Sequence, residues 1–188
     1  MKRSEYQELR RNVADLRAKK LSLEGEMVPE SAVFLENRLA NSADPRERAA
    51  LYEMLCDEYA LSGLNHKELE TMRARAREYR DEPVPWIGLA ARLSHEEDML
   101  EEAQQASDHA VSVAKRSDRF VRYALITRAR LAVAQRDWNL LAATLQDLID
   151  DASNERTEDI GYEDDFLQGV EGHLDKAVVR RYRTIARR

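Results

Sequence analysis

Residues 52–59 of this chain read YEMLCDEY, and 34 positions later residues 86–93 read WIGLAARL. In each copy a large ring is followed three, four and seven positions later by an apolar residue, a small residue and a second large apolar residue. Residues with these spacings lie on one face of a helix. The copies therefore predict two amphipathic helices, with packing faces formed by Tyr52, Leu55, Cys56 and Tyr59 and by Trp86, Leu89, Ala90 and Leu93.

The first copy lies in a segment with helix signals at both ends. Asp44 can cap the helix, Pro45 suits its first turn, and Glu47 follows three residues after the cap. The helix should end near Gly63, and Asn65 should open a second helix that returns along the first. The sequence thus predicts a helix-turn-helix unit.

The second copy is followed by a similar return helix. Prolines within residues 81–85 break the chain before this copy. The capping sequence at residues 94–97 then predicts a helix from about His95 to Ala114. Small residues recur along the face that should pack closely on the first helix, at Ala103, Ala106 and Ala110.

A third unit is indicated by helical apolar spacing over residues 120–135 and 138–149, where Asp137 can cap the second helix. The pattern resembles the tetratricopeptide repeat, in which a small residue at the fourth step lets a second helix pack close to the first. The resemblance covers residues 49–150 and implies an all-α fold, a short right-handed α-solenoid of about three helix-turn-helix repeats. The expected organisation is an N-terminal helical extension at residues 1–43, repeats at 44–150, and an acidic linker with a C-terminal capping helix at 151–188.

The N-terminal extension carries an apolar seam at heptad spacing, formed by Tyr6, Leu9, Val13, Leu16, Lys20, Leu23 and Met27. Such a seam either packs against the chain's own next helix, expected from Pro29 to about Ala40, or joins two copies of the chain in a homodimer. The layout is also similar to that of the translocator-type chaperones of type III secretion, which implies a chaperone-like role.

The composition favours helix. Gly numbers 6 and Pro 4 among 188 residues, Val and Ile are scarce beside Ala and Leu, and no run of residues indicates strands. Hydrophobic residues make up 43% of the chain, which excludes wholesale disorder. No stretch of about 18 apolar residues occurs, and the N-terminus lacks an apolar targeting segment, so we expect a cytoplasmic protein without a membrane span.

No motif points to catalysis, to a metal or to a cofactor. The four histidines are dispersed, His95 lacks the second histidine of a zinc-protease helix, and neither a glycine-rich phosphate loop nor a serine elbow occurs. Cys56 occupies the small-residue position of the first unit, so we interpret it as a buried structural thiol. We therefore expect a protein that is not an enzyme.

In tetratricopeptide-repeat proteins the first helices of successive repeats line a concave groove. Carried onto this chain, that geometry assigns to the groove Glu53, Asp57, Ala60, Leu61, Val84, Ile87, Ala91, Tyr123, Ile126, Arg130 and Val133. The surface is mostly apolar, so the resemblance implies binding of a protein or peptide, either an amphipathic helix or an extended segment with apolar anchors. The acidic residues Glu53 and Asp57 disfavour a clamp for a partner's terminal carboxylate. Alternatively, the chain's own N-terminal or C-terminal helix fills the groove.

Two features lie beyond the repeats. Tyr162, Phe166 and Val170 form an apolar stripe on a short expected helix. This helix either acts as a removable lid on the groove or caps the repeats permanently. A last helix is expected from about Asp175, and arginines are frequent in it.

Clustered arginines support an alternative function in nucleic-acid regulation. They occur within residues 73–80, 116–122 and 180–188. However, the formal net charge is −6, many of these arginines have an acidic residue within four positions, and aromatic residues are not interleaved with them. Solvated helix faces explain the clusters better than a nucleic-acid site does.

Overall fold

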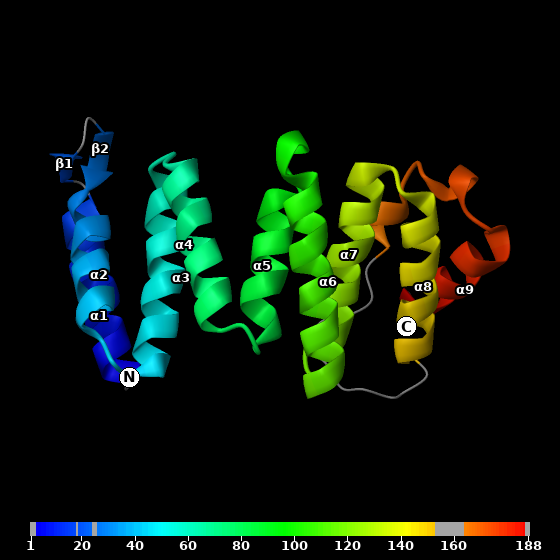
Figure 1. The fold of residues 1–188 in the computed structure, drawn as a ribbon, viewed down its shortest axis with the longest axis horizontal. Coiled ribbons are helices and arrows are strands. Elements are labelled where there is room, and N and C mark those ends of the chain that lie inside the picture. Colours follow the sequence, from blue (N-terminus) through cyan, green and yellow to red (C-terminus); the bar gives the residue numbers. More distant parts are fainter. Residues whose placement is uncertain (1–2, 18, 24–25, 153–163, 187–188) are drawn as a thin grey trace. The chain divides into compact units, whose positions relative to one another are not determined.

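The computed structural model describes residues 3–17, 19–23, 26–152 and 164–186. These residues are almost wholly helical (Figure 1), and the chain forms two compact units, Met1–Glu78 and Tyr79–Arg188, which we call unit 1 and unit 2. No helix among the described residues is both long enough and apolar enough to cross a membrane.

Unit 1 consists of helices that pack on their neighbours in sequence. Its elements are α1 (Arg3–Arg17), β1 (Lys20–Leu23), β2 (Glu26–Pro29), α2 (Glu30–Asn41), α3 (Pro45–Leu61) and α4 (Asn65–Glu78). α1 packs against α2, α2 against α3, and α3 against α4. Apolar residues at helical spacing meet in one core that includes Leu9, Leu35, Leu51 and Tyr59.

The antiparallel hairpin of β1 and β2 shows that the prediction of a chain without strands was wrong. Residues 20–23 alternate polar and apolar side chains, which is the period of a strand, and the helical seam therefore ends at Arg17. Leu9 and Val13, which belong to the helical part of the seam, are buried in the core of unit 1. This part of the seam packs within the chain, whereas Met27 lies exposed on β2.

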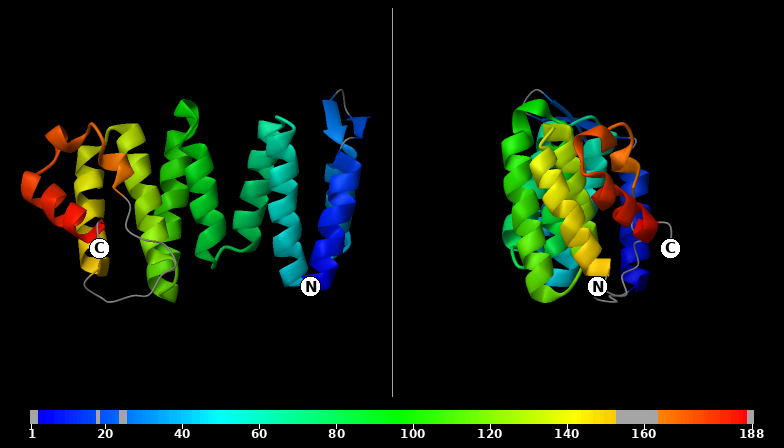
Figure 2. Two further views of the ribbon diagram at one scale, coloured as in Figure 1. Left: turned by 180° about the vertical axis from the view of Figure 1, so that it is seen from behind. Right: turned by 90° about the vertical axis from the view of Figure 1, so that its right-hand side faces the viewer.

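The described part of unit 2 contains two helix pairs and a further C-terminal helix. Its elements are α5 (Pro83–Leu93), α6 (Leu100–Ser117), α7 (Val121–Gln135), α8 (Trp138–Ala152) and α9 (Lys176–Ala186), with 3-10 turns at Asp165–Leu167 and Glu171–His173. α5 packs against α6, α6 against α7, and α7 against α8, while α9 packs against α8 (Figure 2). These include the helices that the sequence predicts for the second and third helix-turn-helix repeats.

The predicted caps of α3 and α8 are confirmed. Asp44 Oδ1 accepts a hydrogen bond from the backbone N–H of Arg46 at 3.0 Å. Asp137 Oδ1 accepts one from the backbone N–H of Leu140 at 2.9 Å. In each case a side-chain oxygen satisfies a backbone donor that has no partner inside the helix.

α6 starts later than predicted, because Ser94 closes the preceding helix instead of opening the next one. The Ser94 hydroxyl donates a hydrogen bond to the carbonyl oxygen of Ala91 at 2.7 Å. Glu96 is likewise engaged by Arg92, whose guanidinium lies 2.8 Å away. A single 3-10 turn, Glu97–Met99, then leads into α6.

Small residues bring α5 and α6 close together. Ala90 of α5 and three residues of α6 are at most 2% exposed, namely Ala103, Ala106 and Ala110. Their burial and the packing of α5 against α6 agree with the small-residue face predicted for this helix pair. A methyl group is the largest side chain that such a contact accommodates without moving the helices apart.

Ala90→Leu should lower the free energy of unfolding of unit 2 by about 1–3 kcal/mol, because a packed contact cannot accept extra methylene groups without strain. Ala91→Leu is the matched control, since Ala91 is exposed one residue further along α5. Urea unfolding followed by circular dichroism measures both variants. Equal losses of stability would contradict close packing at Ala90.

Candidate functional site

Two of the predicted groove residues lie in the hydrophobic core of unit 2. Ile87 is 1% exposed and Ile126 is fully buried. Both belong to a cluster that also contains Phe166 and Leu167 of the C-terminal segment and Tyr182 of α9. The structure therefore corrects the open apolar groove at these two positions, which are buried in one cluster with residues of the chain's own C-terminal segment.

The other predicted groove residues of unit 2 lie around that core. Val84 and Val133 are half-buried, whereas Ala91, Tyr123 and Arg130 are exposed. Arg130 Nη2 donates hydrogen bonds to both carboxylate oxygens of Asp165, at 3.0 and 3.2 Å. This ion pair ties the exposed side of α7 to the C-terminal segment.

The C-terminal segment is not the single amphipathic helix that the sequence predicted. Phe166 lies in one 3-10 turn, Val170 follows it, and Tyr162 is outside the described residues. The ring of His173, in the second turn, stacks on Trp138 of α8 with centroids 4.4 Å apart and planes 4° apart. The segment thus contacts α8 as well as α7.

In unit 1, the predicted groove residue Asp57 lines a cleft between α1 and α3, which we call the α1/α3 cleft. Its volume is about 270 Å³, and it is lined by Arg10, Arg11, Val13, Ala14, Arg17, Met54, Asp57 and Glu58. Leu61, Glu53 and Ala60 are exposed on α3 and do not line it. The walls combine three arginines from α1 with two carboxylates from α3.

A buried carboxylate forms part of the lining of this cleft. The Glu58 side chain is 1% exposed, whereas that of Arg17 is 50% exposed. Arg17 Nε donates to Glu58 Oε1 at 3.0 Å, and the Ser31 hydroxyl donates to Glu58 Oε2 at 2.7 Å. These hydrogen bonds join α1, α2 and α3, and the bond to Glu58 raises the pKa of Arg17, so this side chain stays charged.

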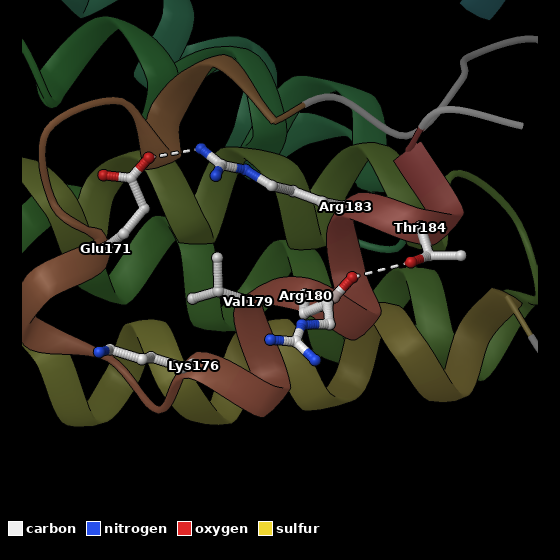
Figure 3. A pocket seen from close by; sticks show the side chains of 6 residues that line it. All are labelled: Glu171, Lys176, Val179, Arg180, Arg183 and Thr184. Carbon is white, nitrogen blue, oxygen red and sulfur yellow. Dashed lines mark hydrogen bonds and ion pairs between the residues drawn. The ribbon is translucent and has the colours of Figure 1, made fainter.

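A second cleft lies along α9 in unit 2, and we call it the α9 cleft (Figure 3). Its volume is about 600 Å³, and it is lined by Glu171, Lys176, Val179, Arg180, Arg183 and Thr184. Arg183 forms an ion pair with Glu171, and its Nε lies 3.7 Å from Asp164. Hydrogen bonds from a backbone N–H and from Arg183 hold the pKa of Glu171 below its usual range, so Glu171 is ionised at neutral pH.

The arginines at residues 116–122 are engaged by carboxylates. Arg116 lies 3.4 Å from Asp81, and Arg119 lies 3.5 Å from Glu82. Arg122 is buried with its Nε 3.6 Å from Asp151. The exposed pairs of Arg116 and Arg119 fit the solvated-face interpretation, because a phosphate would have to displace a carboxylate from each arginine. Arg122 does not fit it, since this side chain is buried with its carboxylate partner.

The half-buried Cys56 does not provide a nucleophile at neutral pH. Removal from water raises the pKa of its thiol to about 12, with a smaller opposing contribution from Arg75. Within the part of the chain that the structure describes, no three His, Cys, Asp or Glu side chains are grouped so that they could hold a metal ion. The two clefts are therefore the surfaces that we consider for function.

The basic residues of the α1/α3 cleft and Lys176 were missed as site residues, although the sequence carries a signal for them, whereas Arg180 and Arg183 belong to the arginine cluster that supported the nucleic-acid alternative. Arg10 and Arg17 are seven residues apart, and Lys176, Arg180 and Arg183 are spaced by four and three. Both spacings place the side chains on one helical face.

No family model matches this chain, and no curated protein or solved structure matches it either.

Proposed function

We propose that this chain is a non-enzymatic scaffold of the tetratricopeptide-repeat type that binds a protein or peptide in the α1/α3 cleft. The observation that supports the proposal most is that arginines from α1 line the same cleft as the predicted groove residue Asp57. Charged walls over an apolar floor suit a peptide, because the apolar contact supplies binding energy and the charges select the partner.

The floor and the walls of the cleft have different chemistry. Val13 and Met54 are buried and apolar, and they form part of the lining. Arg10 and Arg11 are exposed, and neither forms an ion pair with another described residue. A ligand that carries a carboxylate beside an apolar side chain complements both surfaces.

The Arg17–Glu58 pair gives the cleft a defined shape. Because the pair joins α1 to α3, the two walls keep their spacing before a ligand arrives. Less conformational entropy is then lost on binding. The same pair explains why Arg17 is a supporting residue, and why Arg10 and Arg11 are the side chains that we assign to the ligand.

Selection of random peptides displayed on phage by the full chain tests this proposal. We expect the selected peptides to pair an acidic residue with a neighbouring apolar one. The variant Arg10→Glu/Arg11→Glu should bind them about fivefold to thirtyfold more weakly, because two exposed ion pairs are lost. Arg46→Glu is the control, since Arg46 is exposed in unit 1 and does not line the cleft.

Two outcomes would contradict the proposal. One is a failure to select any peptide sequence. The other is an equal effect of the Arg10→Glu/Arg11→Glu and Arg46→Glu changes. Binding of a single-stranded oligonucleotide that weakens steeply with salt, and that Arg10→Glu/Arg11→Glu abolishes, would instead support the nucleic-acid alternative.

A further inference from the structure

The lining of the α9 cleft consists of one face of a helix. Lys176, Val179, Arg180, Arg183 and Thr184 follow one another at spacings of three and one, so that each lies within a turn of the next. Lys176 and Arg180 are about 6 Å apart along the helix axis, because α9 rises about 1.5 Å per residue. Tyr182, three residues after Val179, is buried in the core, and Val179 belongs to the same cluster.

The cations in this cleft differ in their pairing. Arg183 is engaged by Glu171 and lies near Asp164. Lys176 and Arg180 are exposed, and neither forms an ion pair with any residue that the structure describes. Three cations against the one carboxylate of Glu171 leave two uncompensated positive charges in the lining, one turn apart.

An apolar side chain lies between these charges. Figure 3 shows Val179 in the middle of the cleft, with Glu171 and Arg183 on one side of it and Lys176 and Arg180 on the other. Val179 is 6% exposed and belongs to the core of unit 2, so it contributes only a small apolar part of the floor. Lys176, Arg180 and Thr184, which also line the cleft, are exposed.

We propose that the α9 cleft docks an acidic helical segment of a partner protein. Two carboxylates one turn apart on that segment pair with Lys176 and Arg180, and an apolar residue between them covers Val179. A helix is favoured because residues four apart on it have the same axial spacing as Lys176 and Arg180. This site goes beyond the proposed function, since it lies in unit 2 and uses no residue of the α1/α3 cleft.

The cleft is less suited to a nucleic-acid backbone. The ionised Glu171 at its edge would repel a phosphate, and Arg183 is already engaged by that carboxylate. A line of phosphates gains most from unpaired cations on every side. The apolar floor at Val179 also has no counterpart in a phosphate backbone.

The test uses a fluorescent alanine-based peptide of about 16 residues, long enough to be helical in water. The peptide carries two glutamates at positions four apart with a leucine between them, and a control peptide carries glutamines instead. Fluorescence anisotropy with the full chain measures binding of both. We expect the glutamate peptide to bind and the glutamine peptide to bind about fivefold to thirtyfold more weakly.

Reversing the charges of the cleft distinguishes direct recognition of the peptide's glutamates from an effect of the substitutions on folding. Lys176→Glu/Arg180→Glu should abolish the preference for the glutamate peptide and create a preference for a peptide with lysines at the same positions. Arg181→Glu is the control, since Arg181 is the next exposed residue on α9 and does not line the cleft. Circular dichroism verifies that both variants remain folded.

Three results would overturn the inference. They are equal binding of the glutamate and glutamine peptides, equal effects of the Lys176→Glu/Arg180→Glu and Arg181→Glu changes, and failure of the lysine peptide to bind the charge-reversed variant. Tighter binding of a single-stranded oligonucleotide at this cleft than of the glutamate peptide would also overturn it.

Discussion

Arg17→Met is expected to lower the free energy of unfolding of unit 1 by about 2–3 kcal/mol, because it leaves the buried carboxylate of Glu58 with only the Ser31 hydroxyl as a partner. Loss of one member of a fully buried pair costs about 3–5 kcal/mol. The smaller value follows from the 50% exposure of Arg17, since water already solvates part of this pair.

A double-mutant cycle separates the pair from its surroundings. Glu58→Met alone should also destabilise unit 1, but Arg17→Met/Glu58→Met should recover part of the loss, because two apolar side chains leave no buried charge. Urea unfolding measures all three variants. Arg10→Met serves as the control. If Arg17→Met lowered the free energy of unfolding of unit 1 no more than Arg10→Met does, the buried pair would not contribute to stability.

Tyr182→Ala is expected to destabilise unit 2 by about 3–5 kcal/mol, as is usual when a large ring is removed from a core. Tyr182 is fully buried, and its ring centroid lies 5.9 Å from that of Phe166, in the same cluster as Ile87 and Ile126. Arg181→Ala, at the adjacent exposed position, should change stability by less than about 0.5 kcal/mol. Thermal unfolding of the three proteins provides the comparison.

Hydrogen exchange distinguishes a C-terminal segment that is a removable lid from one that is a permanent part of the core. A permanent segment should exchange the amide hydrogens of α9 as slowly as those of α7, since both would open only with the whole unit. Much faster exchange in α9 would show a lid. In that case Tyr182→Ala should raise the affinity for apolar peptides at Ile87 and Ile126 and leave the stability of the other helices unchanged.

Local signals allowed much of the helical architecture to be predicted from the sequence. Asp44 and Asp137 were recognised as caps because a cap needs only a side-chain oxygen within three residues of the backbone donor it satisfies. Ala90 was assigned to a close contact because the resemblance to the tetratricopeptide repeat implies a small residue at this step. The start of α6 was misplaced, since Ser94 can bond to the turn before it as readily as to the turn after it.

By itself, the sequence determined most of the helical segments from α2 to α8 and the apolar face of each, because these properties depend on residues within two turns of one another. It did not determine the β1–β2 hairpin or the 3-10 turns near Phe166. Only the tertiary structure decided what covers each face. Ile87 and Ile126 have the spacing of groove residues, yet they lie in one buried cluster with Phe166 and Leu167, since burying apolar surface is more favourable than leaving it in water. Likewise, the arginines of α1 meet Asp57 only because α1 and α3 flank one cleft.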